Sequence, residues 1–94
     1  MTVEEMFEKY NEEYIHFERI PVDERLSEVE SMCGLLYINK LIKDPTKFEM
    51  AADHDIIYIT PIQALRGLDV EDVIYLCRCG IHYNDEYECL AIFT

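Results

Sequence analysis

The longest run of hydrophobic positions lies at residues 33–42, which read CGLLYINKLI and contain one charged residue, Lys40. The leucines and isoleucines of this run do not fall on one helical stripe, which is typical of a helix that is buried on most sides. We therefore expect a central helix on which the rest of the chain packs, with Leu36, Ile38 and Leu41 in the core.

Local signals predict where this central helix begins and ends. Ser27 and Glu30 have the spacing of a capping box, and Pro45 cannot continue a helix, so the helix is expected over about residues 28–43. Gly34 in its interior costs about 1 kcal/mol relative to alanine. This cost predicts that a neighbouring element approaches the helix closely at that point.

A second helical pattern begins at Thr2 and Glu5, which also have capping-box spacing. From there, apolar residues recur every three or four positions as far as Phe17, and Pro21 then redirects the chain. The sequence thus predicts an amphipathic helix of about four turns with glutamates on its polar side. Its apolar stripe consists of Val3, Met6, Phe7, Tyr10, Tyr14 and Phe17.

Strands are predicted in the C-terminal half, where β-branched and aromatic residues are concentrated. Residues 56–59 read IIYI, and residues 81–83 and 88–93 flank the turn-prone pair Asn84-Asp85 as in a hairpin. Residues 88–93 are apolar enough to form a central strand. We expect this strand to pair with residues 56–59.

Residues 70–79 fit two kinds of secondary structure. Asp69 and Asp72 can cap a helix, and Gly80 stands where a left-handed residue ends one, so a helix is favoured. A strand over the same residues is the alternative, and it would place both cysteines of the segment on one face.

Two further short helices are expected at residues 47–52 and 61–67, each preceded by a capping residue. Together the elements predict one compact domain, residues 1–94, of the α+β class. This domain would be mostly helical, with the central apolar helix packed on a small antiparallel sheet of two or three strands.

Charge changes this picture, because the formal net charge is -12, from 20 acidic and 8 basic residues. The acids gather at the two ends of the chain. Residues 1–30 hold ten acids and three bases, and residues 69–94 hold six acids and one base. The residues between them hold four acids and four bases. Such acidity argues against binding to nucleic acids or to anionic membranes. A partner is expected to be a basic protein.

Carboxylates on the N-terminal helix and in the C-terminal third are the candidate binding residues. Glutamates four positions apart on a helix have Cβ atoms about 5–6 Å apart, comparable to successive phosphates of a nucleic acid strand, so an acidic face can occupy a basic groove. The alternative is that these charges only keep the protein soluble. The candidates are Glu4, Glu8, Glu12, Asp69, Glu71, Asp72, Asp85, Glu86 and Glu88.

Cysteines and histidines offer candidate metal or catalytic chemistry. Cys77 and Cys79 are separated by one residue, whereas structural zinc sites use Cys-x2–4-Cys knuckles, so we expect free buried thiols and no metal or other cofactor. His54 and His82 stand near acidic residues and leave a metal-dependent enzyme open. No nucleophile elbow, phosphate loop or HExxH motif is present, so the sequence predicts a protein that is not an enzyme.

Direct binding to DNA or to a membrane is not expected. The two helices predicted around Gly67 have the proportions of a helix-turn-helix, but the second begins with acidic residues that phosphates would repel. No run reaches the roughly 18–20 apolar residues of a membrane span. Glu4 and Glu5 stand where a secretory signal carries basic residues, so we expect a cytoplasmic protein.

Two segments carry a resemblance to a known group of proteins. Residues 51–60, AADHDIIYIT, and residues 79–93, CGIHYNDEYECLAIF, resemble the C-terminal half of small acidic proteins encoded by bacteriophages and prophages, which generally have no assigned function. The resemblance implies a compact α+β fold and a viral setting, and it transfers no catalytic or binding residue. Small phage proteins often bind and disable a host factor, which favours an interaction function.

Three functional hypotheses follow from the sequence. The first is an acidic protein-interaction module, a phage-encoded inhibitor that acts in the host cytoplasm on the basic, nucleic-acid-binding site of a host protein. The second is a small structural or assembly protein that forms homodimers through its aromatic stripe. The third is a metal-dependent enzyme that uses His54 and His82.

Overall fold

The computed structural model describes residues 1–93. It contains three α-helices and a four-stranded antiparallel sheet, so the predicted α+β class is confirmed, with one strand more than expected. The helices are α1 (Val3–Lys9), α2 (Glu30–Leu41) and α3 (Val70–Arg78). The strands are β1 (Met50–Asp53), β2 (Ile56–Pro61), β3 (Ile81–Asn84) and β4 (Cys89–Phe93).

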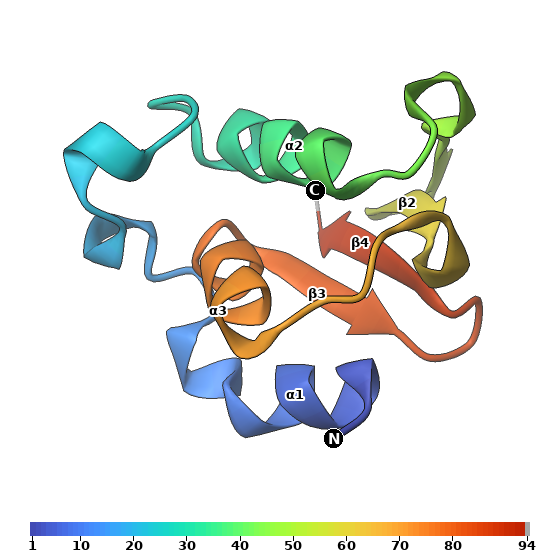
Figure 1. Ribbon diagram of the computed structural model, residues 1–94, viewed down its shortest axis with the longest axis horizontal. Coiled ribbons are helices and arrows are strands. Elements are labelled where there is room, and N and C mark those ends of the chain that lie inside the picture. The colour runs from blue at the N-terminus through green and yellow to red at the C-terminus, as the bar shows by residue number, and fades with distance from the viewer. Residues whose placement is uncertain (94) are drawn as a thin grey trace.

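The strand order in the sheet is β1-β2-β4-β3. β4 is therefore central, pairs with β2 on one side and forms a hairpin with β3 on the other, as the sequence predicted. In this register Ile59 lies opposite Leu90, and both are fully buried. The inner face of the sheet packs on the helices, and Figure 1 shows α1 and α2 on opposite sides of α3 and the β3–β4 hairpin.

Strand β1 was not predicted, because residues 47–52 were expected to form a helix. Asp44 instead caps a single 3-10 turn, Pro45–Lys47, and Met50–Asp53 then pairs with the free edge of β2. The helix expected at residues 61–67 is likewise only the 3-10 turn Ile62–Ala64. In both places pairing within the sheet outweighs weak local helix signals.

Helix α2 is shorter than expected and is buried along only one face. Ser27 does not cap it: its hydroxyl accepts from the Val29 N–H at 3.1 Å, and the helix starts at Glu30 without a side-chain cap. Ile38 and Leu41 are buried as predicted, but Leu36 is 39 % exposed, so its assignment to the core was wrong. The helix packs on the molecule from one side, which leaves the opposite side in solvent.

The close approach predicted at Gly34 is confirmed. A Cβ atom at this position would lie 3.0 Å from the Cβ of Cys79 and 3.1 Å from the side chain of Ile81. Glycine therefore allows α2 to contact the end of α3 and the start of β3.

The predicted four-turn N-terminal helix was wrong beyond Lys9. Thr2 and Glu5 form the expected capping box, but 3-10 turns follow at Asn11–Glu13, Phe17–Arg19 and Val22–Glu24. Ile15 has φ 55° and donates its N–H to the carbonyl of Cys77 at 3.0 Å. Anchoring to α3 thus competes with continuation of the helix.

Residues 70–79 form the predicted helix rather than the alternative strand. The Asp69 carboxylate accepts from the Asp72 N–H at 2.9 Å, and the Asp72 carboxylate accepts from the Asp69 N–H at 3.1 Å. Gly80 follows the helix with φ 81°, a left-handed conformation in which glycine carries no steric penalty. This end directs the chain into β3.

Candidate binding groove

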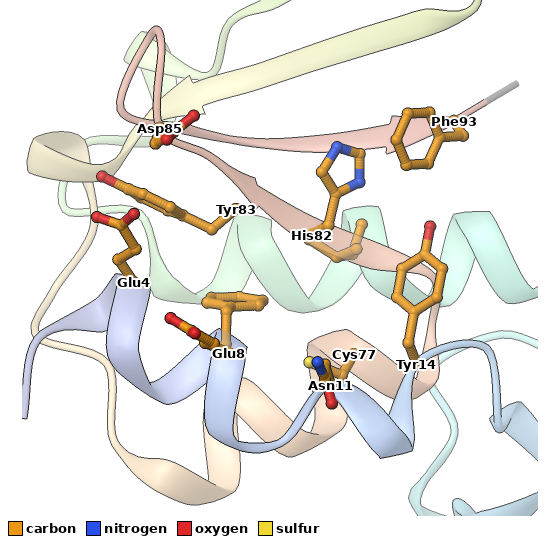
Figure 2. A pocket seen from close by; sticks show the side chains of 11 residues that line it. Glu4, Glu8, Asn11, Tyr14, Cys77, His82, Tyr83, Asp85 and Phe93 are labelled. Atoms are coloured by element: carbon orange, nitrogen blue, oxygen red, sulfur yellow. The ribbon is translucent and has the colours of Figure 1, made fainter.

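A groove of about 530 Å³ runs between α1 and the edge strand β3. Side chains from α1, the turn after it, the end of α3, β3, the turn after β3 and the end of β4 contribute to its walls (Figure 2). We call this feature the α1–β3 groove. It is lined by Glu4, Phe7, Glu8, Asn11, Tyr14, Cys77, Ile81, His82, Tyr83, Asp85 and Phe93.

One end of the α1–β3 groove is acidic. Glu4 and Glu8 contribute from successive turns of α1, and Asp85 contributes from the turn that follows β3 (Figure 2). Burial raises the pKa of Tyr83 at this end, and the carboxylates of Glu88, Glu4 and Asp85 raise it further. Tyr83 lines the groove together with Glu4 and Asp85, so carboxylates from the two ends of the chain lie at the same end of the groove.

The other end of the α1–β3 groove is aromatic. The His82 imidazole stacks on Phe93 with ring centroids 4.2 Å apart and an angle of 11° between the rings, and Tyr14 meets it edge-on at 6.4 Å. The pairing of β3 with β4 produces the stack, because His82 lies opposite Ala91, two residues before Phe93. Figure 2 shows these three rings away from the carboxylates of Glu4 and Glu8.

His82 contributes an uncharged ring to this aromatic end. Its Nδ1 is buried and has no hydrogen-bond partner among residues 1–93. Burial lowers the pKa of His82, so the neutral imidazole is the dominant form at pH 7. The aromatic end of the groove therefore carries no positive charge at neutral pH.

The floor between the two ends is apolar. Phe7 is buried and stacks on Tyr83 with ring centroids 6.3 Å apart. Cys77 is 2 % exposed, and burial, with a smaller effect of Glu13, raises the pKa of its thiol to about 11. The Cys77 thiol is therefore protonated at neutral pH and serves as packing rather than as a nucleophile.

An ion-pair cluster holds the segment after α1 against α3. Glu13 accepts from Arg78 Nε at 2.7 Å and from Arg19 Nη1 at 2.7 Å. Hydrogen bonding from Arg78 is the main reason that the pKa of Glu13 lies below its usual value. Glu13 therefore fixes one wall of the groove rather than facing a partner.

The predicted acids at the start of α3 have a different environment. Asp72 is 3 % exposed, and its carboxylate accepts from Tyr37 Oη at 2.7 Å and from Arg66 at 3.2 and 3.3 Å. Asp69 caps α3. The assignment of Asp72 to an exposed acidic surface therefore has to be corrected, because its charge is used within the fold.

The remaining predicted acids are exposed, and the structure separates them. Glu12 and Glu71 lie outside the groove lining, on the turn after α1 and on α3. Glu86 lies near Tyr58 of β2 instead. Burial is the main reason that the pKa of Tyr58 is raised, and the charge of Glu86 is a smaller one. Of the nine candidates, Glu4, Glu8 and Asp85 line the groove.

Sequence reasoning did not identify the aromatic part of the site. His82 was considered only as a catalytic acid or base or as a metal ligand, and Tyr83 and Phe93 only as strand residues. The hairpin prediction held the missing information, since its register places His82 near Phe93 on one face of the sheet.

The histidines and cysteines do not form a metal centre in the described structure. Within residues 1–93, no three His, Cys, Asp or Glu side chains are grouped so that they could hold a metal ion. The four cysteines are buried free thiols. None of the helices in this part of the chain has the length and apolar character needed to cross a membrane.

The chain matches no model of a protein family, no curated protein and no solved structure.

Proposed function

We propose that this protein is an acidic protein-interaction module that binds a basic partner protein through the α1–β3 groove. The observation that carries the proposal is the meeting of Glu4 and Glu8 with Asp85 in one groove. Asp85 is about 80 positions from Glu4 and Glu8 in the chain, so the fold brings carboxylates from both acidic ends into one groove.

The charge at the groove is not neutralised by the protein itself. Among the described residues, no lysine or arginine lines the groove, although the chain has eight such residues in all. With a net charge of -12, the protein attracts a positively charged surface and accelerates its association. The exposed carboxylates stay hydrated in the free protein and lose water only when a partner covers them.

The kind of partner follows from the same charges. Glu4 and Glu8 are one helical turn apart, a spacing comparable to that of successive phosphates, which supports mimicry of a nucleic acid strand. The proposed partner is thus the basic site of a nucleic-acid-binding protein. The resemblance to phage proteins supports a host protein as the partner and inhibition as the role of this chain.

Capture from a bacterial lysate at low and high salt, followed by mass spectrometry and purification of the partner, tests this function. The variant E4Q/E8Q removes two groove carboxylates, and E12Q/E71Q removes two exposed carboxylates outside the groove. Both doubles change the net charge equally. We expect E4Q/E8Q to weaken binding of the purified partner at least tenfold and E12Q/E71Q to weaken it about twofold or less.

Two results would contradict this proposal. Equal weakening by the two doubles would mean that only net charge attracts the partner and that the groove is not the site. Binding that does not fall as salt rises would exclude an electrostatic interface altogether.

A second candidate function, self-association, is favoured by the outer face of α2. Val29, Met32 and Leu36 are 60, 47 and 39 % exposed and lie three or four residues apart, so they form one apolar stripe. This stripe replaces the aromatic stripe of the N-terminal segment, whose Met6 and Phe7 are buried. Light scattering of the wild type and of M32K at high concentration tests it: a monomeric wild type excludes the homodimer.

A further inference from the structure

The two ends of the α1–β3 groove differ in chemistry, and the difference defines what can fill it. We propose that the groove receives an arginine side chain of the partner at its acidic end and a neighbouring apolar side chain at its aromatic end. This inference rests on the proposed function and specifies the segment of the basic partner that is recognised.

The acidic end fits a guanidinium group. Glu4 and Glu8 form one wall and Asp85 contributes to the other, so carboxylates can accept from more than one edge of a planar cation (Figure 2). Tyr83 lines the groove together with these carboxylates, and Phe7 stacks on it with ring centroids 6.3 Å apart, so the guanidinium plane would stack on the other face of the ring. A guanidinium group presents five donors in a fixed fork and can use carboxylate and ring together.

An ammonium group fits the acidic end less well. Lysine carries a compact, strongly hydrated charge that does not stack on a ring in the way that a guanidinium plane does. Glu4, Glu8 and Asp85 are exposed and do not form a closed cage that would strip that water away. Arginine is therefore the expected occupant and lysine the weaker competitor.

The aromatic end fits an apolar side chain. Phe93 is 57 % exposed, although it stacks on His82 at 4.2 Å, so one side of this aromatic pair is open. His82 brings no charge here, and its buried Nδ1 has no partner among the described residues. Covering the open rings with an aromatic or aliphatic side chain removes apolar surface from water.

The positions of the two ends set the spacing of the two recognised residues in the partner. Tyr83 and His82 are adjacent in β3, so their side chains point to opposite faces of the strand and the two ends are about one strand residue apart. An extended segment beside the edge strand can therefore place an arginine and its neighbour at the two ends. We expect the two residues to be adjacent in the partner, because residues two positions apart in an extended segment point to the same face.

NMR titration of the ¹⁵N-labelled full chain with short peptides tests this inference. The probe is acetyl-Gly-Arg-Phe-Gly-amide, compared with peptides in which lysine or the neutral isostere citrulline replaces arginine, and alanine replaces phenylalanine. We expect shifts at Tyr83 and His82, a dissociation constant at least fivefold higher for lysine than for arginine, and no saturable binding for citrulline. The alanine peptide should bind at least threefold more weakly.

Adjacent acids in one turn provide matched variants for the same titration. Asp85 lines the groove and Glu86 does not, and both are exposed, so D85N and E86Q remove equal charge without affecting the core. We expect D85N to weaken the arginine peptide at least threefold and E86Q to leave it unchanged. Equal effects of the two variants would overturn the placement of the cation.

The outcomes separate this inference from the proposed function. Equal affinity for the arginine and lysine peptides overturns the guanidinium site. The proposed function is still supported in that case if E4Q/E8Q weakens binding of the basic partner. Equal binding of the citrulline peptide, or no shift at Tyr83 and His82 with any peptide at 10 mM, overturns the site as well. If the purified partner binds E4Q/E8Q as tightly as the wild type, the proposed function itself is wrong.

Discussion

The α2–α3 contact and the α1–β3 groove both contain aspartates and tyrosines, but these side chains are paired in the first, whereas the carboxylates of the second face solvent. Between α2 and α3, Tyr37 donates to Asp72 at 2.7 Å, and the Tyr75 hydroxyl lies 3.1 Å from Cys33 Sγ. The Tyr75 hydroxyl also donates to the Glu24 carbonyl, in the 3-10 turn Val22–Glu24, at 2.8 Å. In the groove, the Nδ1 of His82 is unpaired among residues 1–93, and the acids at its rim face solvent. The sequence contains aspartates and aromatic residues in both places.

The difference shows that the type of residue does not distinguish stabilising polar groups from available ones. Asp72 and Asp85 are identical side chains in two acidic turns, yet the first is 3 % exposed and the second lies at the surface. A satisfied carboxylate holds two helices together, whereas an unpaired one remains available to a partner. The predictions below test this comparison, beginning with the largest effect.

Replacing Asp72 by asparagine should have the largest effect. Asparagine keeps the shape, but it loses the charge that accepts hydrogen bonds from Tyr37, Arg66 and the Asp69 N–H. Hydrogen bonds to a buried charged group contribute about 1.5–3 kcal/mol each, so the free energy of unfolding should fall by about 3 kcal/mol in urea titrations. A loss below about 1 kcal/mol would show that these contacts are not stabilising.

The pH dependence of the same contact has a defined sign. Burial alone would raise the pKa of Asp72, but hydrogen bonds from Tyr37, Asp69 and Arg66 outweigh it and hold this pKa below the usual value of 3.8. The stabilisation is therefore complete above pH 3.8 and is lost as pH falls through the lower pKa of the folded state. Acid unfolding of D72N should lack this component.

Replacing Gly34 by alanine should have the next largest effect. The added methyl group would meet the Cβ of Cys79 at 3.0 Å, and overpacking of this kind costs about 1–3 kcal/mol. Higher helix propensity returns about 1 kcal/mol, so a net loss of about 1 kcal/mol is expected in urea titrations. Gly67, which has open space around it, is the control position for G67A.

A smaller effect is expected from His82, and it should depend on pH. Burial lowers the pKa of His82 below 6.5, so the unfolded chain binds a proton more readily than the folded one and stability decreases as pH falls below 6.5. H82F keeps a ring beside Phe93 and removes this titration. The difference between urea midpoints at pH 7.5 and pH 5.5 should therefore be smaller for H82F than for the wild type.

The smallest effect on stability is expected for Asp85. Its side chain is exposed, and D85N should change the free energy of unfolding by less than about 0.5 kcal/mol. A larger loss would mean that Asp85 stabilises the fold as Asp72 does, and the contrast between the two regions would fail.

Local patterns were sufficient to predict several elements of the fold. The caps at Thr2 and Asp69, the glycine after α3, the hairpin and the central position of β4 all follow from short-range signals. Gly34 also indicated a close helix contact correctly. The caps, the glycine and the hairpin depend on residues within a few positions of one another, whereas the place of β4 followed from its apolar composition and the Gly34 contact from the cost of glycine in a helix.

Features that depend on distant contacts could not be predicted. The exposure of Leu36 follows from which side of α2 the other elements cover, and the end of α1 follows from the anchoring of Ile15 to Cys77. β1 forms because β2 offers it an edge. For the groove, the acids were evident from the sequence, but their meeting with His82 and Phe93 depends on the packing of α1 beside β3.

The central position of β4 also has a consequence for biosynthesis. β2 can pair with β1 as soon as residues 50–61 have been made, but β4 separates β2 from β3 and is the last strand of the described chain. The four-stranded sheet cannot assemble until Cys89–Phe93 has left the ribosome, because β3 is joined to β2 only through β4. Ribosome-bound chains that stop before residue 89 will therefore carry both acidic segments without the groove between them.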